Sequence, residues 1–254
     1  MELTFIFILG AILGSFLNVV IYRLPRQESI IAPGSHCPYC SHKLRPWENI
    51  PILSYLLLRG KCSRCKHPIG LRYLLIEVIT PVLLISLYLY SGLSWDFFKN
   101  SVLVLLLIPA TFIDLDHRLI LNKITLPGMF LGLGLSIAGD PAHFLQPLLG
   151  LLAGGGSLWL IALLGQLIYK QESMGGGDIK FGAMIGAFMT PQSVGISLFL
   201  AFFIAAIFVL LGMLLGKIKQ RSTIPFGPFI ALGAFAAINF QSQLIHFYLN
   251  WVLH

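Results

Sequence analysis

The sequence predicts an all-α polytopic membrane protein with about eight transmembrane helices and a small polar insert after the first helix. Composition is the first reason: of the 254 residues, 57% are hydrophobic and only 11% are charged, and the mean hydropathy is +0.85. Soluble globular proteins carry about 25% charged residues, because their surfaces need them. The second reason is that several apolar runs approach or exceed the roughly 20 residues that a membrane-spanning helix needs.

The first apolar run covers 3–22. It contains Gly10, Gly14 and Ser15, small residues that favour close contact with another helix. The run lacks a basic leading segment and a small-residue cleavage site, so we expect a retained span rather than a removed signal peptide.

The composition changes over 23–72, which holds several prolines, all four cysteines and nine of the seventeen Lys and Arg residues. Seven further apolar runs follow, at 73–91, 97–113, 124–138, 145–169, 179–190, 194–216 and 227–250. The run at 179–190 is short, so we expect it to tilt, to merge with its neighbour or to stop before it crosses the bilayer.

Loop charges agree with a count of eight spans. With that count, sixteen of the seventeen basic residues share one side of the membrane and only Lys99 lies opposite. The positive-inside rule makes the shared side cytoplasmic, with both termini facing outward. The same bias accounts for the net charge of +7, so we expect no nucleic-acid partner.

The predicted parts are a first transmembrane helix at 1–22, a cytoplasmic four-cysteine insert at 23–72 and a transmembrane core at 73–254.

The insert contains two Cys-x-x-Cys pairs, Cys37 with Cys40 and Cys62 with Cys65, separated by 21 residues. Two pairs at this spacing are typical of a four-thiolate zinc site, in which the metal stabilises two short knuckles. Two disulfides or unligated thiols are the alternatives, but disulfides are rare in the reducing cytoplasm. No thioredoxin-like strand pattern surrounds the pairs, which disfavours a redox role. We therefore predict that these four cysteines bind one structural zinc ion.

Two acidic residues stand at the ends of apolar runs. Asp114 closes the third predicted span, and Asp178 follows three consecutive glycines, 175–177, at the start of the sixth. The predicted topology places both acids at the cytoplasmic face, although they are 64 positions apart in the sequence. Placing a carboxylate within the membrane costs free energy, so a residue of this kind is a candidate for a functional role.

Two neighbouring aspartates cannot both ionise easily, so they hold one proton between them. The ionised member of such a pair can activate a water molecule while the protonated member polarises a peptide carbonyl. This is the chemistry of an aspartic protease, and it needs no Ser or Cys nucleophile.

Other interpretations of these acids stay open at this point. Asp178 could cap the N-terminus of its helix, where a carboxylate is favoured. Asp114 and Asp116 could be solvated acids that pair with Arg118 or Lys123.

Two other functional classes compete with proteolysis. One is a proton- or cation-coupled transporter that uses Asp114, Asp116, His117 and Asp178. The other is a structural membrane subunit whose zinc insert docks a cytoplasmic partner.

A series of motifs extends along nearly the whole chain, and together they are specific. They are G-S-F-L-N-V-V-I-Y-R-L-P at 14–25, the two Cys-x-x-Cys pairs, N-I-P-I-L-S-Y at 49–55, R-G-K-C at 59–62, R-Y at 72–73 with Glu77, D-L-D-H-R at 114–118, G-G-G-D-I-K at 175–180 and P-F-G-P at 225–228. In these motifs the chain resembles the bacterial type IV prepilin peptidases, also called leader peptidase/N-methyltransferases.

The resemblance implies an aspartic endopeptidase of the bacterial inner membrane, with Asp114 and Asp178 as its catalytic residues. Asp116 would at most assist. The implied substrates are prepilins and pseudopilins of pilus, type II secretion and competence systems. Their short basic leader is cut after a glycine, ahead of a hydrophobic helix. Family members with the cysteine insert also methylate the new N-terminal residue with S-adenosylmethionine. One departure is Leu121, where the family usually has proline; it leaves both acids in place.

Overall fold

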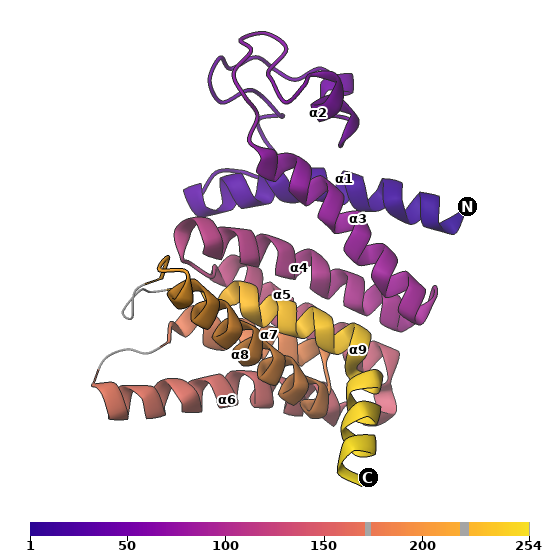
Figure 1. Ribbon diagram of the computed structural model, residues 1–254. Coiled ribbons are helices and arrows are strands. Elements are labelled where there is room, and N and C mark those ends of the chain that lie inside the picture. The colour runs from indigo at the N-terminus through magenta and orange to yellow at the C-terminus, as the bar shows by residue number, and fades with distance from the viewer. Residues whose placement is uncertain (171–173, 219–223, 254) are drawn as a thin grey trace. The chain divides into compact units, whose positions relative to one another are not determined.

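The computed structural model describes residues 1–170, 174–218 and 224–253, and helices account for all the regular structure in these residues apart from two isolated β-bridges (Figure 1). The α-helices are α1 (Glu2–Arg23), α2 (Leu53–Leu57), α3 (Leu71–Ser91), α4 (Trp95–His117), α5 (Asn122–Gly139), α6 (Leu145–Tyr169), α7 (Gly176–Phe188), α8 (Pro191–Leu214) and α9 (Gly227–Leu253). Three short 3-10 helices, η1 (Leu24–Arg26), η2 (Pro46–Asn49) and η3 (Pro141–His143), lie between them. The predicted all-α class is confirmed, and each predicted apolar run forms a helix.

Five of the described helices are long and apolar enough to cross a bilayer: α1, α3, α4, α6 and α8. α5 has 18 residues and α7 has 13, and neither is among these five. α9 has 27 residues, and the apolar part of it whose side chains the structure describes is Gly227–Phe240. At about 1.5 Å per residue, α7 is about 20 Å long, less than the ~30 Å hydrocarbon thickness. The count of eight crossings therefore stays a prediction.

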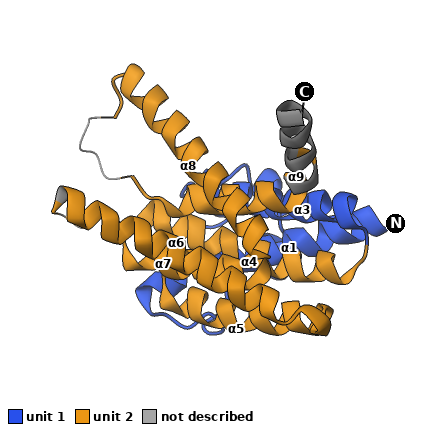
Figure 2. Ribbon diagram, turned by 90° about the horizontal axis from the view of Figure 1, so that it is seen from below, with its two compact units in different colours: residues 1–92 blue, residues 93–254 orange. Residues whose placement is uncertain are grey.

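The chain divides into two compact units, residues 1–92 and 93–254 (Figure 2). The first unit contains α1, α3 and, between them in the sequence, the four-cysteine insert. The second unit contains α4 to α9.

Small residues bring α1 against α3, as the sequence predicts. A Cβ on Gly10 would lie 2.6 Å from the Pro81 Cα, and one on Gly14 would lie 2.9 Å from the Ile76 carbonyl oxygen. The Asn18 side chain donates a hydrogen bond to the Tyr73 carbonyl at 3.0 Å, which satisfies a buried amide at the same contact. Close backbone approach is the usual way in which membrane helices associate.

A buried acid ties the insert to this helix pair. Glu77 on α3 accepts a hydrogen bond from the Ile52 main-chain N–H at 2.7 Å and another from the Ser15 hydroxyl on α1. One carboxylate thus joins α3, α1 and the residue that precedes α2.

The second unit is built around α7, which contacts all five of the other long helices there. Residues 181–188 of this helix are all buried. A helix enclosed by protein on all sides does not need the length of a lipid-facing span. This explains why the chain tolerates a 13-residue helix at this position.

Glycines on both partners bring α6 into backbone contact with α7. A Cβ on Gly154 would lie 2.2 Å from the Gly182 carbonyl oxygen, and a Cβ on Gly186 would lie 2.1 Å from the Gly150 carbonyl oxygen. No larger residue fits at these crossings without moving the main chain.

We predict that Gly154→Ala destabilises the protein, because the new methyl group meets the α7 backbone. The expected loss is about 1–3 kcal/mol, as for other overpacked sites. It is measured as a lower midpoint of thermal unfolding in detergent, followed by tryptophan fluorescence. Gly156→Ala is the matched control, since no atom lies within 4 Å of a Cβ there and helix propensity favours alanine. Equal midpoints for the two variants would argue against this packing.

Candidate active site and metal centre

Asp114 and Asp178 come together in the second unit. Asp114 lies in the last turn of α4 and is 5% exposed, while Asp178 is the third residue of α7 and is half-buried. α4 ends just beyond this point, because Arg118 adopts a left-handed conformation with φ of 54°. The two carboxylates are close enough to interact electrostatically. The fold thus unites two acids that are 64 residues apart in the sequence.

The glycine segment holds Asp178 at the N-terminus of α7. Gly175 is the N-cap, and its main-chain N–H donates a hydrogen bond to the Asp178 carboxylate. In return, the Asp178 N–H donates to the Gly175 carbonyl at 3.1 Å. The capping role considered for Asp178 is therefore present, and it directs the side chain without excluding chemistry.

Asp114 is held by the start of α9. The Gly227 N–H donates to Asp114 Oδ2 at 3.0 Å, in a buried hydrogen bond. A Cβ on Gly227 would lie 2.7 Å from that same oxygen, so glycine is needed for the approach. The first N–H groups of a helix have no intrahelical acceptor and favour a negative charge. This is the structural role of the P-F-G-P motif at 225–228, which sequence analysis leaves without a function.

Two more contacts fix the segments that carry the acids. Ile120, in the loop between α4 and α5, packs against both glycines that flank the site: its Cβ would be 3.0 Å from a Cβ on Gly177, and its Cδ1 would be 3.3 Å from one on Gly227. On the neighbouring face, Lys180 Nζ donates to Asn122 Oδ1 at 3.0 Å, which joins α7 to the start of α5.

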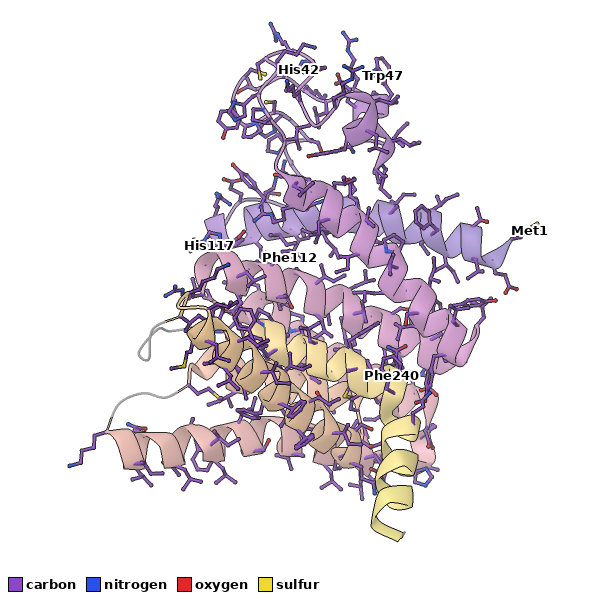
Figure 3. All side chains as sticks on the ribbon, in the orientation of Figure 1. Met1, His42, Trp47, Phe112, His117 and Phe240 are labelled. Atoms are coloured by element: carbon purple, nitrogen blue, oxygen red, sulfur yellow. The ribbon has the colours of Figure 1, made fainter. Side chains whose placement is uncertain are left out.

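The other polar residues of the D-L-D-H-R motif lie apart from this pair. Asp116 is exposed, and two residues along a helix place it roughly 200° around the axis from Asp114. His117 is also exposed, at the end of α4 (Figure 3).

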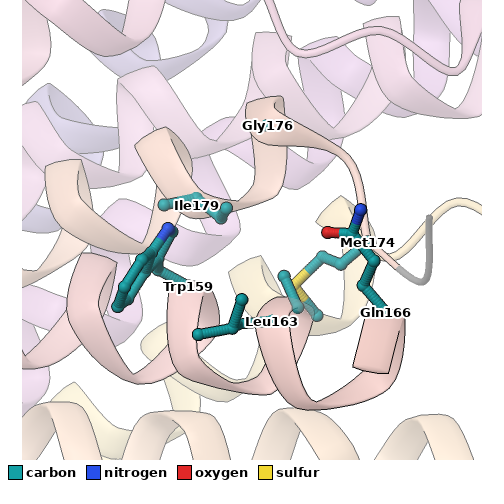
Figure 4. Close-up of a pocket in the computed structure, with 7 residues that line it drawn as sticks. Trp159, Leu163, Gln166, Met174, Gly176 and Ile179 are labelled. Atoms are coloured by element: carbon teal, nitrogen blue, oxygen red, sulfur yellow. The ribbon is translucent and has the colours of Figure 1, made fainter. Parts of the chain in front are cut away.

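A pocket of about 230 Å³ opens beside the start of α7 (Figure 4). Its walls come from α6, through Trp159, Leu163 and Gln166, and from the α7 side, through Met174 and Ile179. Most of the lining residues have apolar side chains, but polar atoms, including the Gln166 amide, make up much of the surface that faces the pocket. It lies next to the segment that carries Asp178.

The four cysteines of the insert form one cluster. Their sulfur atoms all lie within 4.8 Å of one another, and each cysteine is a free thiol. The Cys37 and Cys65 sulfurs are 3.8 Å apart, and those of Cys40 and Cys62 are 3.9 Å apart. Four ligands at about 2.3 Å from a tetrahedral metal lie about 3.8 Å from one another. A disulfide would need about 2.05 Å, so the geometry matches metal ligation.

The two cysteine pairs adopt the same knuckle. In the first, the Cys37 N–H donates to the His42 carbonyl at 2.9 Å, and in the second the Cys62 N–H donates to the His67 carbonyl at 2.9 Å. Each knuckle turns through a residue with positive φ that follows the second cysteine. Main-chain N–H groups of Cys65 and Arg64 lower the pKa of the Cys62 thiol to about 6, while burial and the neighbouring thiols raise the pKa of Cys65 to about 11. Cys62 is therefore the thiol that ionises more readily of the two.

Glu48 links the two knuckles. The Arg45 N–H at 2.8 Å, the Ser63 hydroxyl and the His42 ring at 3.3 Å hold the pKa of this carboxyl below its usual range. His42 and the neighbouring Trp47 both belong to this loop-rich insert (Figure 3). The hydrogen bonds to the Glu48 carboxylate thus stabilise an insert that is too small to form a large apolar core.

Comparison with known proteins identifies the family. Residues 8–91 match the bacterial peptidase A24 N-terminal domain, and residues 101–210 match the type IV leader peptidase family. No solved structure matches the chain.

Curated relatives match nearly the whole chain, and the three described below share one name, prepilin leader peptidase/N-methyltransferase. The Pseudomonas aeruginosa protein is 34% identical over 96% of this chain and 92% of its own length. The Neisseria gonorrhoeae protein is 33% identical over 97% and 93%, and the Aeromonas hydrophila protein 32% over 96% and 93%. The chain belongs to the type IV leader peptidase family. It is therefore an enzyme, and its relatives' names combine peptidase and N-methyltransferase activity.

We predict that Gly227→Ala lowers peptidase activity roughly 10²-fold, because the added methyl group displaces Asp114 and small misplacements at a reacting centre have effects of this size. The measurement is the rate of leader removal from a prepilin by purified protein in detergent. Gly195→Ala on α8 is the control, since a Cβ there meets no atom within 4 Å. Unchanged activity in Gly227→Ala would show that the Gly227–Asp114 contact is dispensable.

Proposed function

We propose that the protein is a membrane aspartic endopeptidase that removes the short basic leader of prepilins or pseudopilins, with Asp114 and Asp178 as its catalytic residues. The observation that carries the proposal is the convergence of these two acids. Each is bound by a main-chain N–H at the start of a helix, and their carboxylates interact. Family membership supplies the peptidase class.

The mechanism follows from a pair that shares one proton. The ionised carboxylate takes a proton from a water molecule as the water oxygen attacks the scissile carbonyl carbon. The protonated carboxyl group donates its proton to the carbonyl oxygen. The tetrahedral intermediate then breaks at the C–N bond: the nitrogen receives a proton from the pair and leaves as a free amine, while one hydroxyl of the intermediate returns its proton to the pair, which restores the shared proton. The Gly227 and Gly175 N–H groups keep the carboxylates oriented throughout.

The surroundings of the pair suit a substrate with an extended leader and an apolar helix. Gly176 leaves room for an extended backbone, since no atom lies within 4 Å of a Cβ there. The pocket lined by Trp159 and Leu163 would accept apolar side chains next to the cleavage point. Loop charges support a cytoplasmic location for this end of the helices, where a basic leader would remain during insertion. Membrane lipid would surround the helices.

The four-cysteine cluster would hold a structural zinc ion. The sulfur separations support this, since they are those of a tetrahedral site. In this proposal the insert at 23–72 is a cytoplasmic domain that follows a first transmembrane helix at 1–22, and the peptidase core covers 73–254. The metal would stabilise the insert and take no part in peptide cleavage.

The second activity would be methylation of the new N-terminal residue. The names of the relatives supply this part of the proposal, and S-adenosylmethionine would be the methyl donor. Cleavage provides the free amine that methylation requires, so peptide cleavage would come first.

We expect Asp114→Asn and Asp178→Asn each to lower leader cleavage by roughly 10³-fold or more, the scale of general acid–base catalysis. Incubation with a prepilin, followed by mass spectrometry, detects both leader loss and an added methyl group. Asp116→Asn is the control, and it should keep most of the activity. Cleavage at the normal rate by both active-site variants would refute the proposal. Proton or cation flux in vesicles without any cleavage would instead identify a transporter.

We expect elemental analysis of purified protein to find one zinc ion per chain. Cys62→Ser should lose the metal and make the insert more sensitive to protease, because zinc binding supplies much of the folding energy of such knuckles. Active, protease-resistant protein without zinc would contradict this assignment.

A further inference from the structure

The short helix α2 of the insert has an exposed apolar face. Its three leucines, Leu53, Leu56 and Leu57, are 56%, 58% and 81% exposed. At about 100° per residue, these side chains lie within an arc of about 100° on one side of the helix. Tyr55 lies on the other side, where its hydroxyl donates a hydrogen bond to the Ile69 carbonyl at 3.3 Å. α2 thus packs on the insert through Tyr55 and presents the three leucines outward; we define them as the leucine surface.

A hydrogen bond to α3 fixes the position of this surface along the helix pair. Ile52 directly precedes α2, and its N–H donates to Glu77 Oε2 at 2.7 Å. Glu77 follows Leu71, the first residue of α3, by six positions, or about 9 Å along the helix axis. Ser15, whose hydroxyl donates to the same carboxylate, lies eight positions, or about 12 Å, before the last residue of α1. The start of α2 therefore lies alongside the α1–α3 pair, inside the ends of both helices (Figure 1).

The two helices are only slightly longer than the hydrocarbon layer of a bilayer. α1 has 22 residues and α3 has 21, which corresponds to about 32–33 Å, against a layer of about 30 Å. When these helices cross the bilayer, a contact that far inside their ends lies at or below the boundary between headgroups and hydrocarbon. Helices that lie in a membrane surface bury their apolar face by about 5–10 Å at this boundary. The leucine surface is thus held at the depth where lipid would cover it.

The charge around α2 suits the same environment. The range 23–72 holds nine Lys and Arg residues and two acidic residues, a formal excess of seven positive charges. Arg59 and Lys61 follow α2 closely, and both are exposed. Before α2, the Arg45 guanidinium lies 5.4 Å from the ring centroid of Trp47, which is also exposed. Tryptophan and basic side chains are enriched where a protein meets lipid headgroups, and basic residues favour anionic lipids.

We propose that α2 inserts into the membrane leaflet next to the insert, where the leucine surface contacts acyl chains and the nearby basic side chains contact anionic headgroups. A second copy of the chain or another protein could also cover three leucines. The hydrogen bond from Ile52 to Glu77 favours lipid, because it holds α2 beside two helices that cross the bilayer. The inference concerns how the insert is attached to the membrane, and it does not depend on the proposed peptidase or methyltransferase activity.

The test is photocrosslinking of the full-length protein in nanodiscs of phosphatidylethanolamine and phosphatidylglycerol. With p-benzoylphenylalanine in place of Leu57, irradiation should add the mass of a phospholipid to the peptide that contains position 57. The same photoreactive residue in place of Tyr39 is the matched control, since Tyr39 is 68% exposed but belongs to the first cysteine knuckle. Position 39 should capture roughly tenfold less lipid, because only an inserted face contacts acyl chains.

Three results would overturn the proposal. They are the absence of a lipid adduct at position 57, equal lipid capture at positions 57 and 39, and a crosslinked dimer in place of the lipid adduct. The last result would assign the leucine surface to a second copy of the chain.

A second measurement follows the release of α2 from lipid. Leu56→Gln combined with Leu57→Gln should raise the rate of trypsin cleavage after Arg59 in the same nanodiscs roughly tenfold, because the variant loses the apolar burial of two leucines. Cleavage after Lys43, an exposed residue of the first knuckle, should not change, which shows that the insert stays folded. Equal cleavage after Arg59 in the variant and the unaltered protein would contradict the proposal. If cleavage rises at both sites, the insert has unfolded, and the lipid adduct at position 57 decides.

Discussion

The hydrogen bond from the Gly227 N–H to Asp114 is the contact on which the second unit depends. A buried carboxylate is costly unless it is paired or hydrogen-bonded, and here the start of α9 supplies a donor at 3.0 Å. The donor can approach only because residue 227 has no Cβ. Ile120 packs against the same glycine and against Gly177, so the ends of α4, α7 and α9 are fixed together. The arrangement that lowers the cost of burying Asp114 is thus also the one that places Asp178 beside it.

The two units satisfy their buried polar groups by different contacts. In the second unit the carboxylates bind main-chain N–H groups at helix starts, and close glycine contacts pack α6 against α7. In the first, Glu77 is satisfied by α1 and the insert, the four thiols form a cluster, and the buried Arg23 guanidinium donates hydrogen bonds to main-chain carbonyls of the insert.

The sequence is most informative where a pattern is local. Apolar runs predict the helices, the Cys-x-x-Cys spacing predicts a compact thiol cluster, and the small residues Gly10 and Gly14 mark a real helix contact. Contacts between distant residues leave no such trace. A main-chain N–H at 227 that binds a carboxylate 113 positions earlier has no side-chain signature, so the role of P-F-G-P stays hidden. Hydropathy also cannot distinguish a lipid-facing span from α7, whose apolar residues face protein.

The central claim is that Asp114 and Asp178 act as one unit that shares a proton. The most direct test is the pH dependence of kcat/KM for leader cleavage by the unaltered protein. A shared proton requires one ionised and one protonated carboxyl, so the rate should fall on both the acidic and the basic side of a single maximum. A rate that rises with pH to a plateau, or that does not change across the range where carboxyl groups titrate, would contradict the account.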